Sequence, residues 1–265
     1  MGKVIGVISL KGGVGKTSVV TALGDSIANF NKKVLLIDGN LSAPNLGLYL
    51  DIINPKVTLH DVLARKANIS EAVYGLDNLD VIPSGLFSNL EVNPFLLRDK
   101  IKDLKRKYDS IIIDSSPSLG NETLAVMLAS DRLIVVTTPD YPTLSTTLKA
   151  IKLAKQRGTK IDGLIINKAY GKKFELSFED IESTLEVPVL AVIPYDINVL
   201  KALSEFTPST SSKPKSKASE EYKHLGAILI GEKYKASKLK RLDKWINPKR
   251  QEINREVYYR SVFGN

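Results

Sequence analysis

Residues 11–18 read Lys-Gly-Gly-Val-Gly-Lys-Thr-Ser, and this stretch decides how the rest of the chain is interpreted. It follows an apolar, β-branched run over residues 4–9 and precedes a helical pattern over residues 17–30. Glycines leave backbone N–H groups free to turn inward around phosphate oxygens, and the N-terminus of the following helix favours an anion. A strand, this loop and a helix in that order predict a phosphate-binding loop rather than a turn that merely begins a helix.

The loop also predicts which ligands it binds. By analogy with other phosphate loops, Lys16 reaches the β- and γ-phosphates of a nucleotide, and the hydroxyl of Thr17 ligates Mg²⁺. We therefore expect ATP or ADP with Mg²⁺ as cofactors. The loop residues expected to contact the nucleotide are Gly12, Gly13, Val14, Gly15, Lys16, Thr17 and Ser18.

The chain up to residue 231 alternates short apolar runs with helical patterns, which is typical of an α/β fold with a mainly parallel, twisted sheet and helices on both faces. The expected strands are residues 4–9, 33–38, 79–83, 110–114, 132–138, 161–167 and 187–194. The expected helices are residues 17–30, 94–107, 121–129, 143–156, 177–185 and 218–231, and the polar residues 207–215 are expected to form a surface loop. We interpret residues 1–231 as one nucleotide-binding domain and residues 232–265 as a separate tail.

Composition and charge exclude several classes of protein. The absence of cysteine among the 265 residues excludes disulfides, thiolate metal sites and iron–sulfur clusters. No secretory leader pattern and no apolar run of about 18 residues is present, so we expect a cytoplasmic protein or one bound peripherally to the inner face of the cell membrane. The net charge is +9, but residues 211–265 hold 14 Lys and Arg against 6 Asp and Glu, which leaves 24 basic and 23 acidic residues before them. An anionic partner is therefore expected at the C-terminal quarter.

One departure from the ordinary phosphate loop is informative. Leu10 stands five residues before Gly15, where glycine is usual, and an extra lysine, Lys11, opens the motif. In this the loop resembles the deviant Walker A motif of the MinD/ParA family of P-loop ATPases. The resemblance implies a SIMIBI-type P-loop NTPase fold and a homodimer around ATP, in which Lys11 reaches the phosphates bound by the partner. It assigns catalytic roles to Lys11 and Lys16.

Further segments resemble the same family, in the expected order, over roughly residues 1–231. Asp38 ends a strand at the first switch of the family and Asp114 ends another at the second, which implies that both serve Mg²⁺ together with Thr17, Asp114 acting through water. The residues that match the segments around the adenine ring are Asn167, Lys168, Pro194, Tyr195 and Asp196, with Asn167 as the reader of the base edge. Residues 58–63 and 186–191 are similar to the archaeal MinD-like branch in particular.

The first switch departs from the family pattern in a way that affects catalysis. The family usually has Asp-x-Asp there, and its second carboxylate places the attacking water, whereas this chain has Asn40. An amide oxygen accepts a hydrogen bond from water, but it carries no charge and takes no proton. Loss of such a contact costs on the order of 10²-fold in rate, so we expect slow hydrolysis with nucleotide binding intact. Asp38 is retained and is expected to serve Mg²⁺ and the water network.

The tail contains a short basic amphipathic pattern. A helical projection of residues 239–246 places its apolar side chains on one side, with Lys240, Arg241 and Lys244 opposite, and such a helix is a candidate for a membrane interface. The residues expected to contact the membrane are Leu239, Leu242, Trp245 and Ile246, and the residues of a second apolar stripe are Ile253, Val257, Tyr258, Val262 and Phe263. Three alternatives stay open for this tail: an anionic membrane, the body of the protein or a partner protein, and the backbone of DNA.

Two functions from different classes compete at this stage. The first is a MinD-like switch ATPase that positions cellular machinery such as the division site, is recruited to the membrane as an ATP dimer and is released with the help of an activating protein partner. The second is a ParA-like partition ATPase whose dimer binds DNA nonspecifically. Lys11 favours this switch class over metabolic enzymes that share the loop, and the missing cysteines exclude carriers of metal clusters.

Overall fold

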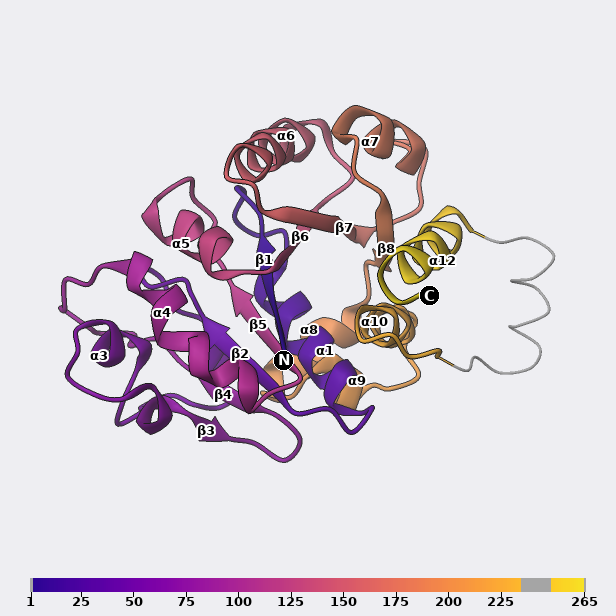
Figure 1. The fold of residues 1–265 in the computed structure, drawn as a ribbon. Coiled ribbons are helices and arrows are strands. Elements are labelled where there is room, and N and C mark those ends of the chain that lie inside the picture. Colours follow the sequence, from indigo (N-terminus) through magenta and orange to yellow (C-terminus); the bar gives the residue numbers. More distant parts are fainter. Residues whose placement is uncertain (1, 235–248, 265) are drawn as a thin grey trace.

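The computed structural model describes residues 2–234 and 249–264, which form an eight-stranded sheet with helices on both faces (Figure 1). The strand order is β3-β4-β2-β5-β1-β6-β7-β8, and every neighbouring pair is parallel except β3 with β4. The strands are β1 (Lys3–Ile8), β2 (Val34–Asp38), β3 (Tyr74–Gly75), β4 (Asp80–Ile82), β5 (Ser110–Asp114), β6 (Arg132–Thr137), β7 (Lys160–Ala169) and β8 (Val189–Pro194). The predicted parallel α/β architecture is confirmed.

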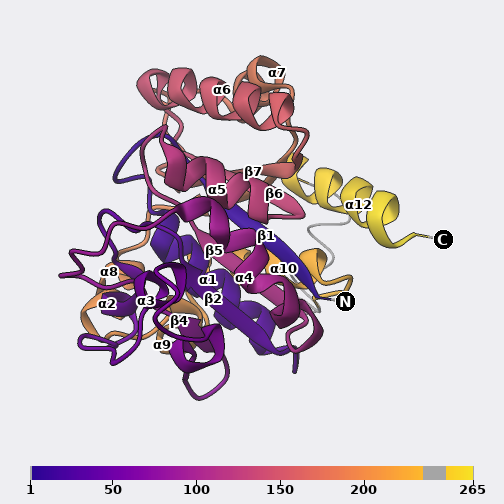
Figure 2. The same ribbon diagram turned by 60° about the vertical axis from the view of Figure 1, so that its left-hand side comes forward.

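The helices divide between the two faces of the sheet. The α-helices are α1 (Lys16–Ala28), α2 (Leu46–Tyr49), α3 (Leu59–Leu63), α4 (Leu97–Ile101), α5 (Asn121–Ala129), α6 (Tyr141–Gln156), α7 (Phe178–Leu185), α8 (Ile197–Ser204), α9 (Ser209–Ser212), α10 (Lys217–Leu229) and α12 (Arg250–Phe263). Apolar side chains of α3 to α7 form one core cluster with the sheet, and those of α1, α2, α10 and α12 form the other. Figure 2 shows the arrangement of these helices around the sheet. Alternate residues of the strands enter opposite clusters, because successive side chains of a strand point to opposite faces.

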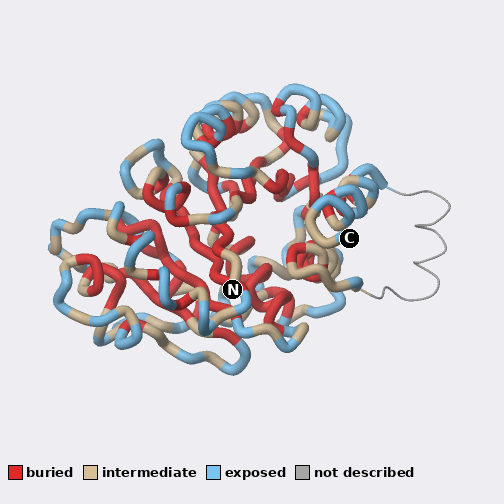
Figure 3. Tube along the Cα trace, in the orientation of Figure 1, coloured by how far each residue is buried: buried red, intermediate tan, exposed pale blue. Residues whose placement is uncertain are grey.

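Burial explains why the central strands read as continuous apolar runs. All residues of β2 and β5 are buried, because helices cover both faces of the parallel sheet (Figure 3). The last residues of these strands, Asp38 and Asp114, are 0% and 1% exposed, so two carboxylates lie in the interior where the strands end. This edge of the sheet is where the candidate site lies.

Two local predictions were wrong. The single helix expected over residues 94–107 is broken into the 3-10 helix η2 (Pro94–Leu96), α4 and the 3-10 helix η3 (Lys102–Arg106). Residues 207–215 were expected to be a surface loop, but they contain α9, in which Ser209 and Thr210 are buried. The reason is a hydrogen-bond partner inside the fold, because the hydroxyl of Thr210 donates to the buried carboxylate of Asp25 in α1, so this polar segment is satisfied without water.

The end of the chain packs on the body through polar contacts. The hydroxyl of Tyr258 in α12 donates to Asp162 at 2.8 Å, and Arg255 pairs with Glu221 at 3.1 Å. Asn254 donates to the carbonyl of Val189 on the edge strand β8 at 2.9 Å. For α12, therefore, the body of the protein is the contact among the three alternatives left open for the tail.

The expected second apolar stripe is wrong in part. Ile253 and Val257 are 50% and 61% exposed, whereas Tyr258 is buried together with the polar side chains of Gln251 and Arg255. Hydrogen bonds and ion pairs, together with the apolar contacts of Tyr258, Val262 and Phe263, thus hold this side of α12 against the body. The expected membrane-contacting residues, Leu239, Leu242, Trp245 and Ile246, lie outside the described residues. None of the helices within the described ranges has the length and apolar composition that a bilayer crossing requires.

Candidate nucleotide-binding site

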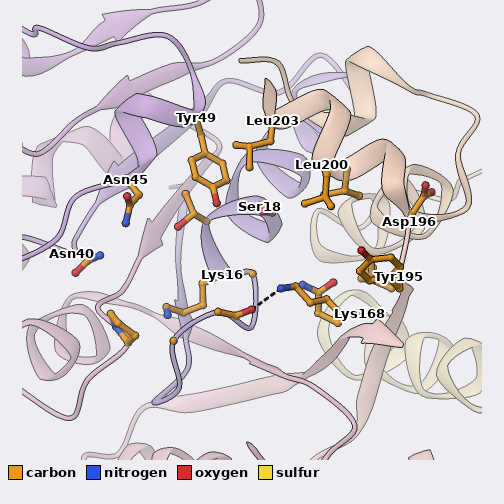
Figure 4. A pocket seen from close by; sticks show the side chains of 18 of the residues that line it. Lys16, Ser18, Asn40, Asn45, Tyr49, Lys168, Tyr195, Asp196, Leu200 and Leu203 are labelled. Atoms are coloured by element: carbon orange, nitrogen blue, oxygen red, sulfur yellow. Dashed lines mark hydrogen bonds between the residues drawn. The ribbon is translucent and has the colours of Figure 1, made fainter. Parts of the chain in front are cut away.

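A cavity of about 280 Å³ opens at the ends of β1, β7 and β8, above the loop that joins β1 to α1 (Figure 4). The predicted nucleotide-contacting residues that line it are Gly12, Gly13, Gly15, Lys16, Thr17, Ser18, Asn167, Lys168, Pro194, Tyr195 and Asp196. Asn40 lines the same cavity from the loop after β2. Segments that lie far apart in the sequence thus meet around one space of the size that a small ligand needs.

The loop before α1 has a backbone that requires glycine. Gly13 and Gly15 have φ angles of +76° and +90°, which favour glycine over residues with a side chain. A Cβ atom on Gly15 would also lie 2.5 Å from the amide nitrogen of Asn167. Val14, although predicted to contact the nucleotide, is 2% exposed and packs in the core below the loop. The loop therefore presents backbone to the cavity and buries its one apolar side chain.

Two side chains from the end of β7 brace this loop. The Nδ2 atom of Asn167 donates to the carbonyl of Val14 at 2.7 Å, and the ammonium of Lys168 donates to the carbonyl of Gly13 at 2.7 Å. Lys168 has a φ of +58°, a conformation that is uncommon for residues other than glycine and costs on the order of 1 kcal/mol or more. Both carbonyls are thereby satisfied, and the loop is held in this conformation by side chains from β7.

The base end of the cavity is lined by aromatic and aliphatic side chains. The ring of Tyr195 stacks on Tyr170 with centroids 4.8 Å apart and an interplanar angle of 16°. Asp196 caps the N-terminus of α8 by accepting from the backbone of Asn198 at 2.9 Å, and these hydrogen bonds lower the pKa of its carboxyl against the opposing effect of burial. The lining residues that were not among the predicted contacts are Asn45, Tyr49, Ser115, Pro117, Ile193, Val199, Leu200 and Leu203. The spacing of Leu200 and Leu203 on α8 after Asp196 is a signal that could have found these two.

The phosphate end holds one lysine and two carboxylates in the interior. Lys16 is 8% exposed, and burial lowers the pKa of its ammonium, which the nearby Asp114 carboxylate partly offsets. The hydroxyl of Thr17 donates to Oδ2 of Asp114 at 2.5 Å. Burial raises the pKa of Asp114 and of Asp38 above the ordinary range, and for Asp38 the neighbouring Asp114 adds to the rise. A bound cation would offset this cost of burying two carboxylates.

The chemistry of these donors fits Mg²⁺ held together with a nucleotide. Oδ1 of Asp114 is buried and has no hydrogen-bond partner among the described residues, so it is available to a metal-bound water. No cluster of three or more His, Asp or Glu side chains exists within residues 2–234 and 249–264 that could hold a metal alone. Mg²⁺ keeps several waters and takes phosphate oxygens as ligands, which suits a site with one hydroxyl and few carboxylates.

Asp38 does not point into the cavity but holds the loop that follows it. One of its oxygens accepts from the backbone of Asn40 at 3.2 Å, and the other accepts from the backbone of Asn45 and Leu46 at 3.1 and 3.0 Å. Asp38 therefore shapes the loop after β2, and its role at the metal stays a prediction. The side chain of Asn40 donates to the carbonyl of Ala43, and its Oδ1 is buried without a partner among the described residues.

Lys11 lies outside the cavity of its own chain. Its ammonium contacts Asp140 at 3.2 Å and the hydroxyl of Thr143 at 2.6 Å, both at the start of α6, and its side chain is 39% exposed. Hydrogen bonds from Thr138, Thr143 and Lys11 lower the pKa of Asp140 to about 2, although burial acts in the opposite direction. The extra lysine of the motif therefore lies at the surface. It does not line the cavity that the following residues of its own loop surround.

Comparisons with known proteins show which family this chain is similar to. The family model of an AAA domain matches residues 2–162. An uncharacterised ATP-binding protein of Methanocaldococcus jannaschii is 38% identical, over 92% of this chain and 93% of its own length, and the septum site-determining protein MinD of Thermotoga maritima is 33% identical, over 88% and 89%. The structure of MinD from Pyrococcus horikoshii complexed with Mg-ADP superimposes with a TM-score of 0.83 at 32% identity, over 91% of this chain and 98% of that one.

Proposed function

The chain belongs to the MinD/ParA family of P-loop ATPases, and from this premise we propose that it is a switch ATPase that binds Mg²⁺ with ATP, dimerises in that state, and takes part in spatial positioning such as the placement of the division site. The placement of Lys11 is the observation that carries the proposal. Its side chain is 39% exposed, pairs with Asp140 and does not line the cavity of its own chain, which supports a contact with a nucleotide bound by another molecule.

In this proposal Lys16, Thr17 and Asp114 act on the phosphates and the metal. Lys16 neutralises the β- and γ-phosphates, Thr17 ligates Mg²⁺, and Asp114 holds a metal-bound water through its unpaired oxygen. Bound Mg²⁺ supplies positive charge that stabilises the leaving diphosphate. Asn167 and Lys168 keep the loop in shape, and Tyr195 and Asp196 border the base.

We further propose that hydrolysis is slow, because Asn40 stands at the position that orients the attacking water. The side chain of Asn40 lines the cavity, and its Oδ1 has no hydrogen-bond partner among the described residues, so it can accept a hydrogen bond from water, but it cannot take the proton. Slow turnover would lengthen the lifetime of the ATP dimer, and release would then depend on an activating protein partner.

Light scattering of the purified protein after gel filtration tests the dimer. The mass should double with ATP and Mg²⁺ but not with ADP, and Lys11→Ala should remain a monomer in both. Lys172→Ala, which removes an exposed lysine elsewhere, serves as the matched control and should dimerise as the unaltered chain does. A Lys11→Ala variant that dimerises normally would refute the proposal.

The proposed location is the cytoplasm, with the ATP dimer held at the anionic inner face of the cell membrane. The basic C-terminal quarter supports this, since basic residues near an anionic leaflet contribute about 1 kcal/mol each and dimerisation pairs two weak sites. Sedimentation with phosphatidylglycerol vesicles or with duplex DNA, in ATP and in ADP, separates the two candidate surfaces. A blue shift in the fluorescence of Trp245, the single tryptophan, should accompany binding to vesicles. ATP-dependent binding to DNA without binding to vesicles would favour the ParA-like alternative.

A further inference from the structure

A second cavity, of about 710 Å³, lies next to the base end of the nucleotide site, and we call it the edge cavity. Its walls come from the ends of β7 and β8, from the start of α7, from residues between 215 and 224, and from residues 249–252. Figure 1 shows α10 and α12 side by side at the edge of the sheet that β8 forms. Pro194 lines both cavities, whereas their other described lining residues differ.

The carboxylates of the edge cavity are already engaged by the protein. Those of Glu220, Glu221 and Glu252 accept hydrogen bonds at 3.2, 3.1 and 3.3 Å. The fourth, Glu179, is exposed and lies near Arg250, which also forms an ion pair with Glu182. These acidic groups therefore leave little negative charge unmatched inside the edge cavity.

Three lysines of the edge cavity differ from the carboxylates in this respect. The ammonium groups of Lys215, Lys217 and Lys249 form no hydrogen bond or ion pair with any residue in 2–234 or 249–264. Two helices also begin here, because Lys217 is the first residue of α10 and Lys249 directly precedes α12. The N–H groups in the first turn of a helix carry partial positive charge. Lysines and two helix N-termini around one space favour an anion with more than one negative charge.

A buried amide in the edge cavity lacks a partner as well. Gln251, in the first turn of α12, lines the cavity and is only 8% exposed. No hydrogen bond joins its side chain to another residue in the described part of the chain. Buried polar side chains nearly always have a hydrogen-bond partner. An acceptor inside the edge cavity would provide one for Gln251.

The sheet side of the edge cavity is apolar. Ala169, Val192 and Pro194 line it from the ends of β7 and β8, and Phe178 lines it from the first turn of α7. An apolar wall beside cationic groups suits a ligand with both an apolar body and a charged group. A small inorganic anion would leave this wall without a contact.

We propose that the edge cavity binds a phosphate monoester with an apolar body. Lys217 and Lys249 meet the phosphate, the amide of Gln251 donates to it, and the body packs against Val192 and Phe178. A phosphate monoester carries more than one negative charge at neutral pH and offers three acceptor oxygens, which matches these donors. The same chemistry occurs in free phosphate esters and in the headgroup of phosphatidic acid. The proposal does not depend on the ATPase function proposed above.

Isothermal titration of the full-length protein with 1-naphthyl phosphate tests the proposal, with saturating ADP and Mg²⁺ present so that the nucleotide site is filled. We expect saturable binding that is about 5-fold weaker in Lys217→Gln and roughly 10-fold weaker in Gln251→Leu, since a hydrogen bond to a charged group is stronger when it is buried. Inorganic phosphate and 1-naphthol, which each carry half of the proposed ligand, should bind roughly 10-fold more weakly than the ester.

Two matched controls lie on exposed positions of α6 and line no part of the edge cavity. Lys152→Gln and Gln156→Leu make the same two chemical changes there, and both variants should bind the ester as the unaltered chain does. Lys217 is exposed, so its replacement leaves folding intact and keeps the test valid even if Gln251→Leu is unstable. The melting temperature of Gln251→Leu, which loses an unpartnered amide at similar volume, should stay unchanged or rise.

Several outcomes would overturn the proposal. They are the absence of saturable binding, equal affinity in Lys217→Gln, Gln251→Leu and the unaltered chain, and equal binding of 1-naphthol. Displacement of the ester by ADP would assign it to the nucleotide site and would equally overturn the proposal.

Competition with vesicles then distinguishes the two sources of the phosphate. Displacement of the ester by phosphatidylcholine vesicles that contain phosphatidic acid, but not by those that contain phosphatidylglycerol, would assign a lipid headgroup to the edge cavity. Displacement by neither would assign a free phosphate ester. Displacement by both would show a response to surface charge rather than to a monoester, and the proposal would be wrong.

Discussion

The loop between β1 and α1 is held by side chains that come from β7, whereas the loop after β2 is held by a carboxylate at its own base. Asn167 and Lys168 satisfy two carbonyls of the first loop, and Asp38 accepts three N–H groups of the second. The first side has its backbone paired before any ligand arrives. The second side retains buried oxygens of Asn40 and Asp114 without partners among the described residues. In the proposed function, a nucleotide would therefore meet a preformed binding half and a catalytic half that needs water and metal to complete it.

The largest expected effect is on the catalytic half. Asn40→Asp would supply a charged acceptor for the attacking water, and we expect turnover to rise on the order of 10²-fold. The affinity for ATP should change little, because the binding half is untouched. Phosphate release under saturating ATP measures the rate, and a fluorescent ATP analogue measures affinity. An unchanged rate would show that Asn40 does not limit hydrolysis.

A change in the binding half should alter the affinity for ATP. Lys16→Gln removes a buried positive charge that faces the phosphates, and loss of a charge-assisted hydrogen bond should weaken ATP binding by roughly 30-fold. Isothermal titration with ATP and Mg²⁺ checks this result. Retention of full affinity would mean that the backbone of the loop, rather than Lys16, provides the binding free energy.

Loss of the hydrogen bond from Asn167 to the loop should weaken nucleotide binding less than loss of Lys16 does. Asn167→Ala leaves the carbonyl of Val14 without its donor, and we expect about 10-fold weaker nucleotide binding from this loss of about 1.4 kcal/mol. The melting temperature, measured in parallel without nucleotide, separates a loosened loop from a loosened fold. A fall in melting temperature large enough to explain the affinity would contradict a local brace.

The smallest effect is expected at a site that touches neither loop. Tyr258→Phe removes the hydrogen bond between α12 and the buried Asp162, which should lower the free energy of unfolding by about 1 kcal/mol without changing nucleotide affinity. Tyr259→Phe, at the adjacent and less buried position, is the matched control. Urea denaturation followed by circular dichroism measures both. Equal stability of the two variants would show that the hydroxyl of Tyr258 contributes nothing to the docking of α12.

Sequence patterns predicted the parts of the molecule in which a residue type is required for a single, local physical reason. Buried parallel strands are continuous apolar runs, and Gly13 and Gly15 have φ angles that favour glycine, so the sheet and the loop could be anticipated. Failures occurred where a distant partner decides the structure. Thr210 is buried because Asp25 lies beside it, and Arg255 in α12 faces the sheet because Glu221 accepts its hydrogen bond.

The same reason limits what could be foreseen within the site. Motif positions predicted which residues gather around the cavity, but not that Asn167 would be directed at Val14 or that Asp38 would hold backbone N–H groups. The contact of Asn167 depends on how β7 ends relative to β1, and the contacts of Asp38 depend on how the loop after β2 turns back on it, so neither could be derived from the motif alone. Tyr49 was missed because a single apolar residue on a short helix gives no pattern distinct from that of the core.

The strand order has a consequence for how the protein is made. β1 lies between β5 and β6, so the strand that leads into the phosphate-binding loop pairs only with segments that begin at Ser110 and Arg132. The brace from Asn167 comes later still along the chain. During synthesis the N-terminal segment therefore leaves the ribosome without partners for its apolar strand, and it must stay unpaired until Ser110–Asp114 of β5 have followed. The ability to bind a nucleotide arises late in translation and all at once, although the motif responsible for it is among the first residues made.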